Sequence, residues 1–176
     1  RRQRQMCIRD RDIACVFGCP FEGEMPIQDL VDLVGRVKET GINAFTLCDT
    51  VGMAYPSLIE RVFSTMKKEY PDTEFNVHIH DTRNMGILNS YVALNCGADS
   101  VQTSIGGLGG CPFAPGATAN TSTEDLVYML NQCGYDTGID FDILLETAKY
   151  ELSVIDGNYS GHHIRIAENP CMVVQA

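Results

Sequence analysis

The chain has 176 residues, of which 44% are hydrophobic, so it is long enough to bury one ordinary core. Its formal net charge of −10 and the lack of a basic stripe argue against binding to the phosphate backbone of nucleic acids. No hydrophobic run is long enough for a membrane span, so we expect neither nucleic-acid nor membrane partners.

Short apolar runs alternate with helical patterns along the chain. We expect strands over 13–17, 44–48, 75–80 and 100–105, and helices over 26–40, 56–70, 86–96, 122–130 and 141–152. Pro26 suits the first turn of a helix, and Gly41 suits the position after a helix end. The last residues, 156–176, show no clear period, and we interpret His162 and His163 there as surface residues.

Four strand–helix repeats predict right-handed βαβ units and a parallel sheet, which is an α/β fold. Each predicted strand ends in a polar or glycine-rich loop, and in a β/α barrel such loops gather at one face to form the active site. A complete barrel has about 250 residues. We therefore predict a partial TIM (β/α)8 barrel, about its last four βα units plus a C-terminal helix. The alternative is a small, open, doubly wound sheet.

The first eleven residues are basic, whereas the rest of the chain is acidic. The string Met-Cys-Ile-Arg-Asp-Arg at 6–11 resembles the translation of a transposon end used in sequencing libraries. We interpret 1–11 as a library scar, with a basic N-terminal arm as the alternative, 12–155 as the C-terminal half of a barrel, and 156–176 as a tail. A barrel cut in half would expose strand edges and an apolar lumen, so we expect such a fragment to be inactive and to self-associate.

His78 and His80 occupy alternate positions at the end of a predicted strand, so their imidazoles point to the same face. Neutral imidazoles bind divalent metals, and Asn120 further along could add an amide oxygen. The simpler interpretation is that one histidine packs in the core and the other lies at the surface. Two histidines and one asparagine are an incomplete site, so a carboxylate must come from elsewhere.

Cys111 ends a loop in which Gly106, Gly107, Gly109 and Gly110 surround one leucine. Ordering so many glycines costs entropy, which indicates close approach to a ligand or a moving loop. A thiol delivered there can serve as a general acid or base. The simpler interpretation is a glycine-rich turn with an incidental thiol.

Other residues are candidates for supporting roles. Asp49 ends a predicted strand beside Thr50, and Glu124 starts a helix as a capping carboxylate or an orienting group. Most of the eight cysteines, such as Cys48 and Cys96, lie within apolar patterns, so we expect free thiols in a reducing compartment.

Several segments resemble the 3-hydroxy-3-methylglutaryl-CoA lyases of the DRE-TIM metallolyase superfamily. The Gly-Leu-Gly-Gly-Cys-Pro-Phe-Ala-Pro-Gly-Ala-Thr-Ala-Asn stretch at 107–120 is the most specific match, and the segments at 18–23, 49–52 and 78–82 fit as well. The resemblance runs from about residue 13 to residue 152. The related condensing synthases share the His-x-His motif but carry a different sequence in place of the Cys111 loop.

The resemblance implies a retro-Claisen cleavage of a 3-hydroxyacyl-CoA. It implies that His78, His80 and Asn120 bind Mg²⁺ or Mn²⁺ and that Cys111 transfers a proton, with Asp49 contributing to catalysis. Glu124 and Thr50 would support the site, and Gly107, Gly109, Gly110 and Arg83 would form the substrate loop. The complete protein is expected to be a homodimer, cytoplasmic or, in a eukaryote, in the mitochondrial matrix.

Two departures from the family pattern matter. The Arg-Asp pair of the family's first strand, which supplies a metal carboxylate, is absent, since Arg9-Asp10 precedes the wrong strand. Arg83 follows the His-x-His-Asp-Thr motif where the best-known lyases have a tyrosine, so it could pair with a substrate carboxylate or face solvent. A lyase for another hydroxyacyl-CoA, a condensing transferase and an inactive fragment remain as alternatives.

Overall fold

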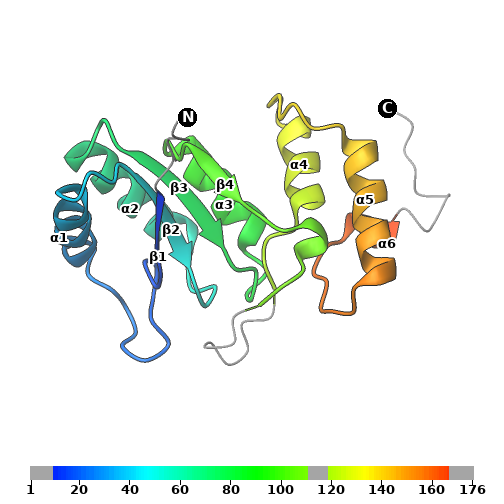
Figure 1. Ribbon diagram of the computed structural model, residues 1–176, viewed down its shortest axis with the longest axis horizontal. Coiled ribbons are helices and arrows are strands. Elements are labelled where there is room, and N and C mark those ends of the chain that lie inside the picture. Colours follow the sequence, from blue (N-terminus) through cyan, green and yellow to red (C-terminus); the bar gives the residue numbers. More distant parts are fainter. Residues whose placement is uncertain (1–9, 111–118, 167–176) are drawn as a thin grey trace, which may run out of the picture.

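The computed structural model describes residues 10–110 and 119–166. Strands and helices alternate through the first part of this range and helices follow (Figure 1). The strands are β1 (Asp10–Ile13), β2 (Ala44–Asp49), β3 (Glu74–Ile79) and β4 (Ser100–Gln102). The helices are α1 (Ile27–Lys38), α2 (Pro56–Glu69), α3 (Gly86–Asn95), the 3-10 turn η1 (Ile105–Gly107), α4 (Thr123–Gln132), α5 (Phe141–Val154) and α6 (His163–Ile166).

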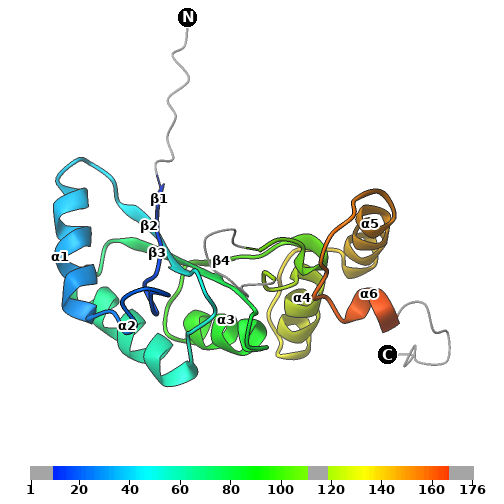
Figure 2. The same ribbon diagram turned by 90° about the horizontal axis from the view of Figure 1, so that it is seen from below.

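The four strands form one parallel sheet in the order β1-β2-β3-β4. This sequential order is that of a barrel wall, whereas a doubly wound sheet reverses its order at a switch point. Helices α1, α2 and α3 lie along one face of the sheet (Figure 2). The prediction of a partial β/α barrel is therefore confirmed, and the alternative of a doubly wound sheet is wrong.

The hydrophobic core lies between the sheet and these helices. Phe45 and Leu47 of β2 are in register with Phe75 and Val77 of β3, and all four side chains are fully buried. They pack with the inner faces of α1 and α2, which include Val34, Ile59, Val62, Phe63 and Met66. Each strand thus contributes alternate residues to one apolar layer.

The opposite face of the sheet is polar. The intervening positions hold Thr46, Cys48, Asn76, His78, Ser100 and Gln102. Gln102 Nε2 donates to Thr46 Oγ1 at 3.0 Å, and Ser100 Oγ donates to Asn76 Oδ1 at 2.6 Å. The expectation of an apolar lumen was wrong, because β2 and β3 carry their large apolar side chains on the face that packs against the helices.

The first strand lies earlier in the chain than expected. β1 ends at Ile13, and the chain then turns at Cys15, which has a φ of 58° and whose N–H donates to Thr50 Oγ1 at 2.8 Å. Val16 and Phe17 are buried as part of the following loop. These two side chains pack in the hydrophobic core from a loop, and this gives the same apolar sequence pattern as a buried strand.

Two other expectations changed at the C-terminal side. The predicted strand over 100–105 ends at Gln102, and the chain enters η1, where Gly106 has a φ of 62° that favours glycine. The tail also contains structure, because α6 begins at His163. The remaining predicted strands and helices match the observed ones to within two residues.

Candidate active site

Two histidines define the centre of the site. His78 lies in β3 and His80 directly follows the strand, and their ring centroids are 5.1 Å apart with the planes at 78°. His80 is buried and His78 half-buried. The expectation that the two rings share one side of the strand is met by this distance.

Asn120 joins the two histidines from a distant part of the chain. Its backbone forms an isolated antiparallel bridge with His80. Its amide Nδ2 donates to the carbonyl oxygen of Leu108 at 3.0 Å, which fixes the orientation of the amide. The structure thus brings together the three residues that were predicted to bind a metal.

Three buried atoms of this cluster have no hydrogen-bond partner within residues 10–110 and 119–166. They are Nδ1 of His78, Nδ1 of His80 and Oδ1 of Asn120. Buried polar atoms in folded proteins normally have partners. Lone-pair donors left without partners on three neighbouring side chains are what a site for a bound cation requires.

The protonation of the two histidines also suits a cation. Burial lowers the pKa of His78, opposed in part by the Gln102 backbone, the charge of Asp12 and the Asn120 side chain. Burial likewise lowers the pKa of His80, and the neighbouring His78 lowers it further. Both imidazoles are therefore neutral at pH 7 and keep a lone pair available.

The donor set consists of two imidazole nitrogens and one amide oxygen. Within the described part of the chain, no group of three or more His, Cys, Asp or Glu side chains could hold a metal ion. The residues present fit a divalent metal but supply no carboxylate. The expectation that a carboxylate comes from elsewhere stays a prediction.

Asp49 holds a loop in place beside this cluster. Its carboxylate is 1% exposed, with Oδ1 accepting from Met53 N at 2.8 Å and Oδ2 from Ala54 N at 3.0 Å. Burial raises the pKa of Asp49, although these hydrogen bonds oppose the shift. The geometry gives Asp49 a loop-stabilising function, and its predicted part in catalysis stays a prediction.

Arg83 and Thr50 connect neighbouring loops. Arg83 NH1 donates to the carbonyl oxygens of Val51 and Gly52 at 3.0 and 2.8 Å, so this exposed side chain binds the loop that follows β2. Thr50 Oγ1 accepts from the Cys15 N–H. Arg83 is thus bound to protein carbonyls, an arrangement that neither of the two interpretations from the sequence included.

Glu124 is fully buried and binds the glycine loop. Its Oε2 accepts from Gly106 N at 2.9 Å, and its Oε1 has no hydrogen-bond partner within the described residues. The capping interaction of α4 is made by Ser122, whose hydroxyl accepts from Asp125 N at 3.3 Å. The capping interpretation of Glu124 was therefore wrong.

The glycine loop is described only up to residue 110. Gly107 is buried and Gly109 and Gly110 are exposed, and a Cβ on Gly109 would lie 2.5 Å from Asn120 Nδ2. Glycine at 109 therefore allows the loop to approach Asn120 closely. Cys111 lies outside the described residues, so its predicted proton transfer stays a prediction.

A polar cluster at the start of α4 was not predicted from the sequence. The carboxylate of Asp125, with 4% of the side chain exposed, accepts from the backbone N–H groups of His162 and His163 and contacts both rings. His163 is only 20% exposed, so the expectation of a surface residue is wrong for it and correct for His162, at 64%. No local pattern could indicate a contact across 37 residues.

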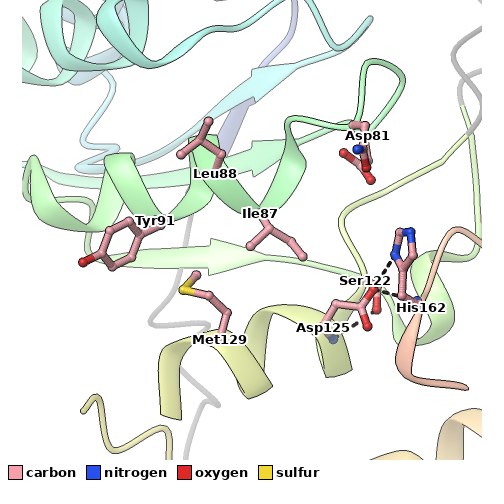
Figure 3. Close-up of a pocket in the computed structure, with 9 residues that line it drawn as sticks. Asp81, Ile87, Leu88, Tyr91, Ser122, Asp125, Met129 and His162 are labelled. Carbon is pink, nitrogen blue, oxygen red and sulfur yellow. Dashed lines mark hydrogen bonds and ion pairs between the residues drawn. The ribbon is translucent and has the colours of Figure 1, made fainter. Parts of the chain in front are cut away.

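A cavity of about 370 Å³ lies between α3 and α4 (Figure 3). Ile87, Tyr91 and Met129 form its apolar part, and Asp81, Asp125 and His162 lie at one end. Of the predicted site residues within 10–110 and 119–166, none lines it. Of the helices in the described ranges, none is long and apolar enough to cross a membrane.

The parallel sheet, with the His-x-His–Asn cluster beyond the carboxyl end of β3, is part of an enzyme-type β/α barrel. The family model described as HMGL-like matches residues 2–150, and the chain belongs to this family. The resemblance stated from the motifs is thereby confirmed.

Known relatives agree with this assignment. The hydroxymethylglutaryl-CoA lyase YngG of Bacillus subtilis is 40% identical over 138 residues, which are 78% of this chain and 46% of that protein. The mitochondrial hydroxymethylglutaryl-CoA lyase of Mus musculus is 35% identical over 159 residues, 90% of this chain and 48% of that protein. The chain thus spans about half the length of the curated relatives it matches.

A solved structure shows the same fold. An HMG-CoA lyase from Acinetobacter baumannii, in complex with coenzyme A and 3-methylmalate, matches with a TM-score of 0.84 and 36% identity. The match covers 92% of this chain and 53% of the lyase chain. The described strands and helices therefore correspond to about half of a complete lyase chain.

Proposed function

We propose that this chain is part of a carbon–carbon lyase that uses Mg²⁺ or Mn²⁺ to cleave a 3-hydroxyacyl-CoA, such as 3-hydroxy-3-methylglutaryl-CoA, to acetyl-CoA and a keto acid. The observation that carries the proposal is the set of three buried lone-pair donors without partners, on His78, His80 and Asn120. The family supports a lyase, and the relative that binds coenzyme A supports a CoA-linked substrate.

The metal ligands would come from one strand end and one distant loop. His78 and His80 present neutral imidazoles because burial lowers the pKa of each. Asn120 presents its Oδ1, since its Nδ2 is engaged by Leu108. A divalent ion bound there would act as a Lewis acid toward the hydroxyl oxygen of the substrate.

The chemistry requires proton transfers that the chain's own groups could perform. Removal of the hydroxyl proton lets a keto group form while the neighbouring C–C bond breaks, and the electron pair of that bond becomes the enolate of acetyl-CoA. A proton must then be added to that enolate. We assign this transfer to the Cys111 thiol, which follows the exposed Gly109 and Gly110 in the sequence.

Metal binding is tested first and by itself. Titration calorimetry with Mn²⁺ is expected to show one site in the wild-type chain. Replacing one of about three ligands should weaken binding at least tenfold in His80→Gln and Asn120→Ala. Asn95→Ala is the matched control, since Asn95 is exposed on α3 and donates to the Tyr91 carbonyl oxygen. Equal Mn²⁺ affinity in Asn120→Ala and Asn95→Ala would overturn the assignment.

Cleavage is tested separately. The chain is incubated with Mn²⁺ and 3-hydroxy-3-methylglutaryl-CoA, and acetyl-CoA is measured by chromatography. Acetyl-CoA formed by the wild-type chain but not by Cys111→Ala supports both the reaction and the role of the thiol. Mn²⁺ binding without any cleavage, in a protein that includes the relatives' remaining half, would support the metal site and refute the lyase reaction.

A further inference from the structure

A segment near the C-terminus packs directly against the glycine loop. Residues 157–163, here called the C-terminal brace, connect α5 to the start of α6. Gly161 N donates to Gly106 O at 2.9 Å, and the Tyr159 ring lies so near that a Cβ on Gly106 would be 2.5 Å from it. Ser160 Oγ fills the space that a Cβ on Gly107 would take. The brace therefore packs so closely against the loop that neither Gly106 nor Gly107 could carry a side chain.

The brace also reaches Asn120. Ser160 Oγ donates to the backbone carbonyl oxygen of Asn120 at 3.0 Å. On its other side, Asn120 N donates to Gly107 O at 3.3 Å. The main chain of Asn120 is thus held from both sides, while Leu108 O fixes its side-chain amide. Displacement of Ser160 would therefore change where the Asn120 amide oxygen lies.

Asp125 anchors the brace to α4. Its Oδ2 accepts from His162 N at 2.7 Å and lies 3.2 Å from the His162 ring Nδ1 (Figure 3). Its Oδ1 accepts from His163 N at 2.9 Å and lies 2.6 Å from the His163 ring Nδ1. Burial alone would raise the pKa of Asp125, but these donors hold it below its usual value. A buried carboxylate with charge-assisted hydrogen bonds is a strong attachment.

The start of α4 also binds the glycine loop, at the same residue that the brace contacts. Glu124, the neighbour of Asp125, accepts from Gly106 N, and Gly161 approaches its Oε1 so closely that a Cβ would collide with it. The start of α4, the brace and the loop therefore form one packed unit. The hydrogen bonds that join the loop, α4 and the brace connect residues 18 (Gly106 and Glu124) to 55 (Gly106 and Gly161) positions apart, so the unit depends on the tertiary fold.

We propose that the C-terminal brace is a positioning element that sets the place of Asn120 and of the glycine loop, with Ser160 as the residue in direct contact. This inference rests on the proposed metal site for its effect on Asn120. Ser160 acts through Asn120, to whose backbone carbonyl oxygen its hydroxyl donates. Asp125 acts one step further away, because it fixes the segment that carries Ser160.

Amide hydrogen exchange tests the brace without any metal or substrate. The variants are Ser160→Ala and Asp125→Asn, and the matched control is Ser153→Ala, whose exposed hydroxyl donates to the Tyr150 carbonyl oxygen. Loss of the Ser160 hydrogen bond should speed exchange in 105–108 and at Asn120 about fivefold, and loss of the Asp125 anchor should speed it more. Exchange in β3 should stay unchanged, which excludes general unfolding.

Mn²⁺ affinity distinguishes positioning from simple packing. Ser160→Ala should weaken Mn²⁺ binding about fivefold, although Ser160 itself supplies no metal ligand. Faster exchange with unchanged Mn²⁺ affinity would overturn the positioning of Asn120. Exchange equal to that of Ser153→Ala in both variants would overturn the brace altogether. If the wild-type chain binds no Mn²⁺, the proposed function fails, and the exchange result alone decides whether the brace holds the loop.

Discussion

The loop after β2 depends on the Asp49 carboxylate, and this dependence can be measured. In Asp49→Ala, the N–H groups of Met53 and Ala54 lose their acceptors in a region that solvent hardly reaches. Each buried donor left without a partner costs about 1–3 kcal/mol. Removing a carboxylate whose pKa burial has raised offsets part of this cost. We therefore expect a loss of about 3 kcal/mol in the free energy of unfolding.

The conservative variant separates the two roles suggested for this residue. Asp49→Asn keeps one carbonyl oxygen, so only one donor loses its acceptor and the expected loss is about 1 kcal/mol. If Asp49 also takes part in catalysis, Asp49→Asn should lose most cleavage activity while staying folded. If it only stabilises the loop, activity should decrease little and in parallel with stability.

Urea unfolding followed by circular dichroism gives the free energies. Asp136→Ala is the control, because Asp136 Oδ1 also accepts a backbone N–H, from Gly138 at 2.9 Å, but in an exposed turn. Solvent can replace that bond, so the control should lose less than about 0.5 kcal/mol. Equal unfolding midpoints for Asp49→Ala and Asp136→Ala would refute the reasoning.

Three further predictions concern protonation, thiol reactivity and loop contacts. Burial lowers the pKa of His78 and His80, so protons should compete with Mn²⁺ only below the ordinary imidazole pKa of about 6.5. Calorimetry should show constant affinity from pH 8 to pH 7 and weaker binding only below about pH 6.5; a decrease that starts above pH 7 would contradict this. Burial, and to a smaller extent the charge of Asp12, raises the pKa of Cys48 to about 12. Iodoacetamide at pH 8 should therefore alkylate the exposed Cys133 and spare Cys48. Peptide mass spectrometry measures both sites, and equal labelling in the folded chain would show that Cys48 is accessible and ionised. Arg83→Met should speed amide exchange in 51–54 about fivefold, because two carbonyl contacts are lost, whereas the exposed Arg36→Met should leave these amides unchanged.

Local periodicity accounts for the parts of the fold that could be predicted. Helices α1 and α2 carry apolar stripes, and β2 and β3 carry apolar runs, so the positions of these elements could be predicted. The end of β1 could not be predicted from the sequence. The turn depends on a positive φ at Cys15, a residue type that gives no turn signal, and on a hydrogen bond to Thr50 from 35 residues away.

The candidate site also has parts that could be predicted from the sequence and parts that could not. The His78–His80 pair follows from strand alternation, whereas its meeting with Asn120, 18 residues beyond the end of β4, was indicated by the family resemblance. The attachment of His162 and His163 to Asp125 follows from neither. A signal for the polar sheet face was present in the sequence, since Asn76 and His78 alternate with Phe75 and Val77.

The division of the sheet into an apolar and a polar face has an evolutionary consequence. Odd-numbered positions of β2 and β3 hold Phe45, Leu47, Phe75 and Val77 against the helices, while even-numbered positions hold Thr46, Cys48, Asn76 and His78 on the other side. A mutation that alters the chemistry on the polar face leaves the packing layer unchanged. New specificities can therefore accumulate in this half of the barrel without a matching loss of fold stability.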